Sequence, residues 1–260
     1  MSLRVQDLLR HYGGVKALDG VSFEVLPGQC VALIGPNGAG KSTCFACLAG
    51  QQVPTSGRVF WQNHDVTALP PARRQAQGMA RTFQGAQTFE ALTALQNLQL
   101  VLSREQLSWW DRLAGCHTDQ ALQGLAQVGL KDHAQTVVAD LPYGAKKRLE
   151  LAMALAGLPR EGERVLLLDE PAAGLAPAER ADMMALVRQV AHEGVTVLYT
   201  EHNMDAVFGV ADRVLVLMQG RLVADGTPEA VAQDPQVRER YLGLDFALPA
   251  ETKGARDARG

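Results

Sequence analysis

Nine residues near the start of the chain have the types and spacing of a phosphate-binding loop. The stretch "GPNGAGKST" fits the pattern G-x-x-x-x-G-K-[ST], with an apolar strand before it and a helix expected after it. In such a loop, glycines let backbone N–H groups wrap a phosphate, the lysine reaches the β- and γ-phosphates, and the next hydroxyl binds Mg²⁺. The stretch predicts a nucleotide site made by Gly35, Pro36, Asn37, Gly38, Ala39, Gly40, Lys41, Ser42 and Thr43. Ser42 is its expected metal ligand.

A pair of acids ends a second apolar stretch, "VLLLDE", which runs from Val165 to Glu170. Asp169 at the end of a strand can hold Mg²⁺ through the water shell of the ion, and Glu170 can polarise an attacking water. Taken alone, such a pair is more often a surface feature. Because it follows a phosphate-binding loop, we interpret Asp169 as a metal ligand and Glu170 as a catalytic residue.

The elements that must position these residues alternate between strands and helices. The first 35 residues alternate apolar and polar positions, which is typical of short antiparallel strands, and "CVALIG" and "VTVLYTEH" read as buried strands. Residues 88–157 have helical periodicity, and "PAERADMMALVRQVAHEG" is an amphipathic helix. A hairpin turn is expected at Gln219 and Gly220. This alternation predicts an α/β layered sheet.

The composition is that of an ordinary globular protein. The 260 residues are 47% hydrophobic and 20% charged, and the net charge of −3 creates no global basic field, which disfavours nucleic acid as the main partner. No apolar run approaches the ~18 residues of a membrane span, and no signal peptide is evident. We therefore expect any connection to a membrane to come through a partner.

Four cysteines stand at positions 30, 44, 47 and 116, and Cys44 and Cys47 form a C-x-x-C. Metal or redox chemistry is one interpretation of that spacing. No second pair of cysteines or histidines stands at the spacing of metal ligands, so we expect buried, reduced thiols in a reducing cytosol.

With these motifs in this order, the sequence resembles the ATP-binding subunits of ABC transporters over about residues 3–245. Gln84 in "ARTFQ" matches the Q-loop glutamine of that family, a contact of Mg²⁺ and of water. His202 in "TEHNMD" matches the switch histidine that contacts the γ-phosphate, and Tyr12 in "RHYGG" matches the aromatic residue that stacks on adenine. Each has an ordinary alternative, namely a solvated glutamine, a structural histidine or a tyrosine packed on the sheet.

The resemblance implies an α/β fold with a P-loop NTPase core of the RecA-like type. An N-terminal antiparallel β subdomain and a helical subdomain with the signature loop would be added to that core. The expected division is 1–87 with 158–246 for the core and its β subdomain, 88–157 for the helical subdomain, and 247–260 for a disordered tail.

The stretch "LPYGA", Leu141 to Ala145, occupies the position of the family's signature, which is usually L-S-G-G-Q. In the family this loop binds the γ-phosphate of ATP held by the opposite subunit. The resemblance implies that role for Gly144, the residue of the motif that remains in this sequence. Pro142 replaces the usual serine and has neither a hydroxyl nor an N–H. The phosphate therefore loses one charge-assisted donor, worth about 1.5–3 kcal/mol unless another group replaces it.

Two further features bear on that loss. Lys146 or Lys147 could contact the phosphate, although Lys147 and Arg148 could equally belong to a solvated helix face. Ala176 in "AGLAP" stands where an acidic or amide residue is common in the family, which removes a hydrogen bond expected across the interface.

The signature variant and the stretches "LPPARRQAQGMARTFQ", "DEPAAGLAP" and "VRERYLG" resemble one branch, the ATPase subunits of branched-chain amino acid importers. This resemblance implies ATP and Mg²⁺ as ligands. It also implies a second, different ATPase subunit, two transmembrane permease subunits and, indirectly, a solute-binding protein, with no nucleic acid. The chain would lie on the cytoplasmic face of the inner membrane, held there by the permeases.

Three alternatives stay open. ATPase subunits of importers for urea, amides or other solutes share much of this pattern. A soluble ABC ATPase that remodels ribosomes or DNA-repair complexes is disfavoured, because the chain has neither a second ATPase module nor a long coiled-coil insertion. A nucleotide sensor without hydrolysis is disfavoured by the presence of Glu170, His202 and Gln84.

Overall fold

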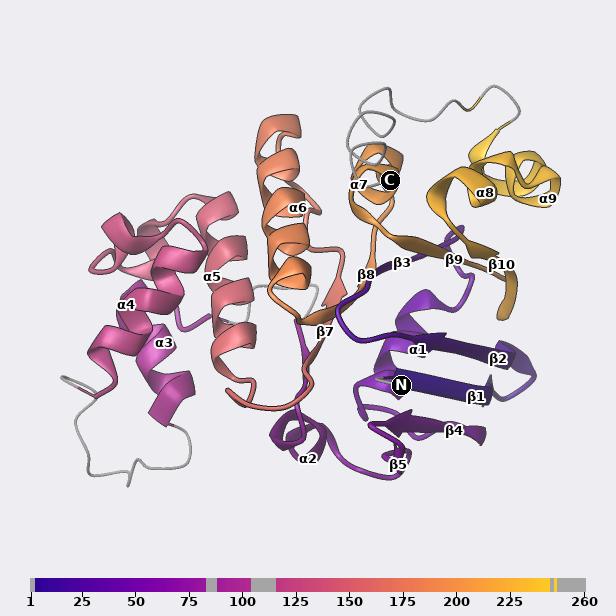
Figure 1. Ribbon diagram of the computed structural model, residues 1–260, viewed down its shortest axis with the longest axis horizontal. Coiled ribbons are helices and arrows are strands. Elements are labelled where there is room, and N and C mark those ends of the chain that lie inside the picture. Colours follow the sequence, from indigo (N-terminus) through magenta and orange to yellow (C-terminus); the bar gives the residue numbers. More distant parts are fainter. Residues whose placement is uncertain (1–2, 83–87, 104–115, 244–245, 247–260) are drawn as a thin grey trace.

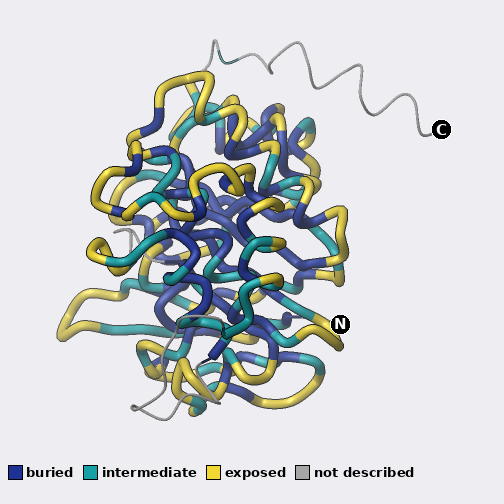
Figure 2. Tube along the Cα trace, turned by 90° about the vertical axis from the view of Figure 1, so that its left-hand side faces the viewer, coloured by how far each residue is buried: buried dark blue, intermediate teal, exposed yellow. Residues whose placement is uncertain are grey.

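The structure of the chain is a computed structural model. It describes residues 3–82, 88–103, 116–243 and 246. Two sheets and the helices around them are shown in Figure 1, and Figure 2 shows buried segments running through the interior with exposed segments at the loops.

A six-stranded sheet forms the centre, in the order β10-β9-β3-β8-β7-β6. The strands are β3 (Cys30–Ile34), β6 (Met79–Arg81), β7 (Val165–Asp169), β8 (Thr196–Thr200), β9 (Arg213–Met218) and β10 (Arg221–Gly226). All neighbours pair in parallel except β9 and β10, which form an antiparallel hairpin. The expected turn at Gln219 and Gly220 is confirmed, and both residues have positive φ, of 49° and 77°.

Parallel strands bring their carboxyl ends to one edge of the sheet. At this edge Gly35 follows β3, Glu170 follows β7 and Glu201 follows β8.

The two faces of the central sheet are covered differently. Leu33 and Leu167 face a core shared with Phe45 of α1 (Lys41–Leu48), whereas Ile34 and Leu168 belong to a core on the other face. This alternation follows from the two-residue period of a strand. Both faces are apolar, which explains why all five residues of β7 are buried.

A four-stranded antiparallel sheet packs beyond α1, in the order β2-β1-β4-β5. Its strands are β1 (Leu3–Tyr12), β2 (Val15–Val25), β4 (Ser56–Trp61) and β5 (His64–Asp65). The short helix α2 (Pro71–Ala76) follows it and carries the buried Arg74, whose guanidinium donates to the carbonyls of Cys47 and Leu48 at the end of α1. The antiparallel strands predicted for the N-terminal part are therefore present.

Three helices gather at one end of the molecule and pack on one another. They are α3 (Ala94–Ser103), α4 (Thr118–Gln127) and α5 (Tyr143–Ala156), and two 3-10 turns, Lys131–His133 and Val138–Asp140, connect α4 to α5. This agrees with the helical periodicity of residues 88–157. The proposed domain boundary at 87/88 borders residues 83–87, which lie outside the described residues, as does the tail from 247 to 260.

The remaining helices follow β7 and the later strands. They are α6 (Pro177–His192), α7 (Met204–Val210), α8 (Pro228–Gln233) and α9 (Pro235–Val237). A π-helical turn, Arg238–Leu242, follows α9, and only Gly243 and Phe246 are described after it. Helices α6 and α7 cover the face of the central sheet opposite α1, through Met183, Val187 and Phe208. Gly194 follows α6 with φ 88°, as a helix C-terminus favours.

Candidate functional site

The predicted phosphate loop joins the end of β3 to the start of α1. Helix α1 begins at Lys41, and its N-cap, Gly40, has a left-handed conformation and no side chain that could cap the helix. The first N–H groups of a helix have no partner within it and carry the positive end of its dipole. Among the described residues, this loop and helix end therefore offer the arrangement that binds a phosphate.

Two glycines of the loop are required by close backbone contacts. A Cβ on Gly35, whose φ is 146°, would lie 2.0 Å from the carbonyl oxygen of Leu217 in β9. A Cβ on Gly40, whose φ is 105°, would lie 2.3 Å from the carbonyl oxygen of Ala17 in β2. Both distances are far inside contact distance, so the loop can press against β2 and β9 only with glycine at these positions.

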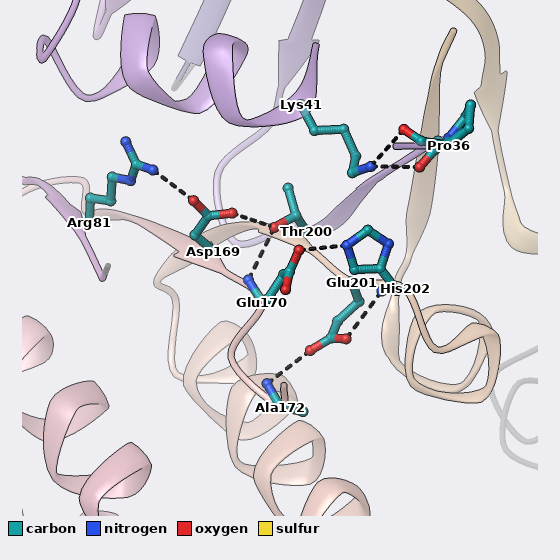
Figure 3. Close-up of polar contacts among 10 residues, drawn as sticks. Pro36, Lys41, Arg81, Asp169, Glu170, Ala172, Thr200, Glu201 and His202 are labelled. Carbon is teal, nitrogen blue, oxygen red and sulfur yellow. Dashed lines mark hydrogen bonds and ion pairs between the residues drawn. The ribbon is translucent and has the colours of Figure 1, made fainter. Parts of the chain in front are cut away.

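Lys41 lies buried within its own loop. Its Nζ donates to the carbonyl oxygens of Gly35 at 2.6 Å and Pro36 at 3.1 Å (Figure 3). Burial lowers the pKa of this amine, while the carboxylates of Glu170 and Asp169 act in the opposite direction. An ammonium group satisfied by carbonyl oxygens can exchange them for phosphate oxygens, which fits the predicted role.

Glu170, predicted to polarise the attacking water, and His202, predicted to contact the γ-phosphate, contact each other. The Nε2 of His202 lies 2.5 Å from Oε1 of Glu170 (Figure 3), and their side chains are 46% and 22% exposed. His202 also lines a cavity of about 320 Å³ together with the phosphate loop. The other lining residues are Gly35, Pro36, Asn37, Met204, Tyr241 and Leu242. This cavity therefore opens onto the start of the phosphate loop and onto the histidine, and Glu170 is connected to it through its contact with His202.

Asp169 is nearly buried and holds two partners. Its Oδ1 accepts from the Thr200 hydroxyl at 2.8 Å, and its Oδ2 accepts from Nη2 of Arg81 at 2.7 Å (Figure 3). Arg81 stands at the end of β6, three residues before Gln84. The guanidinium therefore neutralises a carboxylate that was predicted to serve a metal.

The donors of the predicted metal site fit Mg²⁺, which prefers oxygen ligands and is usually held by one or two protein groups together with phosphates and water. Ser42 is exposed at the start of α1, and Asp169 has one oxygen on a hydroxyl and one on Arg81. In the described part of the chain, no group of three or more His, Cys, Asp or Glu side chains could hold a metal by itself. The third predicted ligand, Gln84, lies outside the described residues.

Glu201 was not predicted to belong to the site, although it directly precedes His202. Its side chain is buried, and its carboxylate accepts from the backbone N–H of Ala172 at 2.8 Å and of His202 at 3.3 Å (Figure 3). Burial raises the pKa of this carboxyl, and the two backbone hydrogen bonds oppose that rise. The sequence analysis also did not predict Arg81, Thr200 and Tyr241 as residues of the site. The only indication of them in the sequence is that they lie beside or near residues of the predicted motifs.

The signature loop leads directly into α5. Pro142 is the N-cap of this helix, which has no side-chain cap and no acidic residue in its first turn. Gly144 is buried in that turn, and a Cβ on it would lie 2.9 Å from Oε1 of Glu179. Glu179 also accepts from the N–H of Ala176 at the start of its own helix, α6, so this side chain of α6 lies beside the first turn of α5.

The basic residues after the signature loop are paired. Lys147 is buried and lies 3.4 Å from Glu150, so it does not belong to the solvated face that was one of its two interpretations. Lys146 pairs with Glu90 at 3.4 Å and Arg148 with Asp182 at 3.3 Å. The replacement of the missing serine donor by Lys146 stays a prediction.

Tyr12 ends β1 and is 42% exposed. Its hydroxyl donates to Gln52, which follows α1, and the guanidinium of Arg10 lies 4.8 Å from the centre of its ring. The phosphate loop instead lies at the opposite end of α1, where Ala17 of β2 contacts Gly40. Stacking of Tyr12 on adenine therefore stays a prediction.

None of the four cysteines forms a disulfide in the part of the chain that the structure describes, and Cys30, Cys44 and Cys47 are buried. Burial raises the pKa of Cys30 to about 12 and that of Cys47 to about 11, so these thiols stay protonated at neutral pH. The expectation of buried thiols thus agrees with the structure at these three positions.

No helix in the described ranges is long and apolar enough to span a bilayer.

Comparison with known families gives two matches. Residues 18–173 match the family model described as "ABC transporter". Residues 221–247 match the one described as "Branched-chain amino acid ATP-binding cassette transporter". The first match contains the phosphate loop, the signature stretch and the acidic pair, and the second begins at β10 and includes α8, α9 and the turn that carries Tyr241.

Curated relatives are similar over nearly their whole length. The "High-affinity branched-chain amino acid transport ATP-binding protein LivG" of Escherichia coli K12 is 37% identical over 253 residues, which cover 93% of this chain and 97% of that one. BraF of Pseudomonas aeruginosa, with the same description, is 38% identical over 254 residues, with the same coverage. The "Lipopolysaccharide export system ATP-binding protein LptB" of Acidithiobacillus ferridurans is 35% identical and covers 95% of this chain and 98% of its own.

Solved structures show the same fold. A nucleotide-free ATP-binding cassette of an ABC transporter has a TM-score of 0.82 at 31% identity and covers 93% of this chain and 99% of its own. The ADP conformation of such a cassette also has a TM-score of 0.82, at 30% identity, with 93% and 98% covered.

Proposed function

This chain belongs to the ABC transporter family of ATP-hydrolysing subunits, and on that basis we propose that it drives an importer of branched-chain amino acids. The observation that supports the substrate class is the match of residues 221–247 to the branched-chain amino acid cassette family. The relatives LivG and BraF, named for that transport, support the same class. LptB, named for lipopolysaccharide export, matches at nearly equal identity, so overall similarity does not decide the substrate.

The proposed site assigns each group a physical task. The glycine loop from Gly35 to Thr43 and the start of α1 bind the phosphates of ATP, and Lys41 exchanges its carbonyl partners for phosphate oxygens. Ser42, Asp169 and Gln84 hold Mg²⁺, which when bound supplies neutralisation of the charge on the β- and γ-phosphates. Tyr12 stacks on the adenine.

Hydrolysis in this proposal depends on Glu170 and His202. The carboxylate of Glu170 accepts a proton from the water whose oxygen forms a bond to the γ-phosphorus, and the bond from that phosphorus to the leaving ADP oxygen breaks. His202, 2.5 Å from the carboxylate in this structure, orients it and contacts the γ-phosphate. Gln84 also senses the γ-phosphate.

Assembly completes the site. A second ATPase subunit, of a different chain, places its signature loop on the ATP bound here, while Gly144 and the start of α5 do the same for the partner's ATP. Two transmembrane permease subunits hold the pair at the cytoplasmic face of the inner membrane and receive solute from a binding protein. Loss of the γ-phosphate removes charge that joins the two subunits, which lets them separate.

Two substitutions test the assignment of the site. Glu170→Gln should leave ATP affinity unchanged and nearly abolish phosphate release, because the amide cannot accept the proton of the attacking water. Lys41→Ala should weaken ATP binding itself. Turnover of Glu170→Gln at near the wild-type rate, or an unchanged ATP affinity of Lys41→Ala, would contradict the respective role.

The transport function is tested on the assembled complex. The tagged chain, purified gently from membranes of its native host, should carry two permease-like proteins and a second ATPase chain. In proteoliposomes this complex should import radiolabelled leucine with ATP, and the Glu170→Gln complex should not. Uptake of urea or acetamide alone would support an importer of amides instead, and recovery of soluble proteins alone would count against a transporter.

A further inference from the structure

The backbone of Glu170 has an unusual conformation. Its φ is 51°, in the left-handed region that residues with a side chain rarely adopt. Such a conformation persists only where the surrounding structure fixes it, and it is common at functional sites. Glu170 directly follows β7, so this turn sets the direction in which its carboxylate leaves the sheet.

Two groups at the end of β8 hold this turn in place. The N–H of Glu170 donates to the carbonyl oxygen of Thr200 at 3.2 Å and to its hydroxyl at 3.1 Å. Two residues further on, the N–H of Ala172 donates to Oε1 of Glu201 at 2.8 Å. The left-handed residue is thus fixed on its N-terminal side by Thr200 and beyond its C-terminal side by the carboxylate of Glu201.

The same carboxylate reaches the backbone of the histidine. Oε2 of Glu201 accepts from the N–H of His202 at 3.3 Å, and the side chain of Glu201 is only 4% exposed (Figure 3). One buried group therefore contacts the backbone of His202 itself and the backbone two residues after Glu170. A buried carboxylate costs free energy through its lost hydration, so its placement here needs a reason.

We propose that Glu201 is a positioning residue for ATP hydrolysis, whose carboxylate fixes the turn after Glu170 together with the backbone of His202 and so keeps the two side chains in contact. The inference rests on the proposed function for the roles of Glu170 and His202. A purely structural role for Glu201 would instead predict a loss of stability without a specific loss of turnover.

The test compares three variants of the full-length chain, purified with its membrane partners. Glu201→Met keeps the length of the side chain but removes both acceptors. Glu201→Gln keeps one oxygen for the N–H of Ala172 and removes the charge. Glu193→Gln makes the same chemical change on the exposed end of α6, where the carboxylate accepts only from a side-chain amide in the described contacts. Phosphate release gives kcat and KM, and amide hydrogen exchange without nucleotide reports on residues 170–173.

The expected pattern is specific. In Glu201→Met, kcat falls about 10- to 100-fold, the effect of losing one hydrogen bond to a charged group, while KM for ATP changes less than about twofold. The N–H of Ala172 exchanges faster by a similar factor. Glu201→Gln restores most of the exchange protection and part of kcat, and Glu193→Gln equals the wild type in both.

Three results would overturn the proposal. They are wild-type kcat in Glu201→Met, a rise in KM with unchanged kcat, and a fall in kcat with unaltered protection of Ala172. The exchange measurement needs no ATP, so it tests the contact of Glu201 with the turn after Glu170 independently of the proposed function. Phosphate release by Glu170→Gln, measured in parallel, judges the proposed function alone.

Discussion

At the scale of single residues, the charged groups of the site are held by contacts with other residues. Lys41 is satisfied by loop carbonyls, Glu170 contacts His202, and Asp169 forms an ion pair with Arg81. In the proposed function, each of these contacts is released or shared when a nucleotide and Mg²⁺ bind. The affinity of the site for its ligands therefore depends on the difference in free energy between the contacts made with the ligands and the contacts within the protein that they replace.

Arg81 makes this competition measurable. The ion pair of Arg81 and Asp169 has side chains only 11% and 4% exposed, so Arg81→Met leaves a buried carboxylate without its cation. We expect the free energy of unfolding of the nucleotide-free chain to fall by about 3 kcal/mol. Mg²⁺ with ADP should then raise the melting temperature more in the variant than in the wild type, because the metal replaces the missing positive charge.

The control for this prediction is Arg58→Met. Arg58 lies 3.9 Å from Asp65 with side chains 68% and 43% exposed, and such a pair contributes less than about 1 kcal/mol. Chemical denaturation with and without Mg²⁺ and ADP measures both variants. Equal stability of Arg81→Met and Arg58→Met would show that Asp169 does not need Arg81.

The residues of the chemical motifs can be proposed from the sequence, whereas the residues that contact and support them cannot. Lys41 and Glu170 are recognised from their neighbours along the chain, and the family and fold that such motifs indicated are confirmed by the match of residues 18–173 and by solved cassettes at 30% and 31% identity. Arg81 and Glu201 act on residues 88 and 29 positions away. Nothing local in the sequence indicates which strands are neighbours, so these contacts required the structure.

At the scale of elements, the start of α1 depends on how closely the loop approaches β2. Gly40 precedes the helix with φ 105°, and a Cβ there would lie 2.3 Å from the carbonyl oxygen of Ala17. Helix α1 cannot move away freely, because Phe45 and Leu48 on it are fully buried in the core between the two sheets. The position of the phosphate loop is thus set by packing on both sides of it.

Gly40→Ala should therefore lower the free energy of unfolding by more than the cost of a positive φ at alanine, because the added Cβ also clashes with the backbone of β2. Gly162→Ala is the matched control, since Gly162 has φ 88° but no atom within 4 Å of an added Cβ. The control should cost about 1–2 kcal/mol, whereas Gly40→Ala should cost at least about 2 kcal/mol more and weaken ATP binding. Denaturation and fluorescent-nucleotide binding measure both, and equal costs would mean that the loop adjusts easily.

Helical periodicity alone did not reveal how α5 uses its basic residues. The run from Lys146 to Arg148 could be a solvated face by charge pattern, but the helix turns Lys147 into the interior beside Glu150. A buried lysine and a glutamate at i and i+3 satisfy each other, a pairing that a charge pattern cannot distinguish from a surface one. Whether a side chain of α5 is buried depends on the elements packed against that helix, among them α3 and α4, and the sequence does not state their placement.

At the scale of the whole molecule, the two halves of the proposed ATP site differ in how closely they follow the family patterns. The phosphate loop, Asp169 and Glu170 match their family patterns, whereas the signature loop carries Pro142 at the N-cap of α5, where no side chain caps the helix. Pairing with a different chain would give the ATP bound here an intact signature from the partner. Pairing with itself would give two sites that each lack the serine donor.

This asymmetry predicts how strongly the chain pairs with itself. In the Glu170→Gln background, where ATP is bound but not hydrolysed, Pro142→Ser should strengthen ATP-dependent self-association by at least about tenfold. The serine supplies one donor to each of two γ-phosphates, each worth about 1.5–3 kcal/mol, and the free energy gained is reduced by the cost of ordering the loop.

Sedimentation velocity with Mg²⁺ and ATP gives the dissociation constants of both variants, and ADP in place of ATP serves as the control that removes the γ-phosphate. A dissociation constant unchanged by Pro142→Ser would mean that the N–H of Gly144 and the start of α5 bind the phosphate without the hydroxyl, and that the proline imposes no need for a different partner.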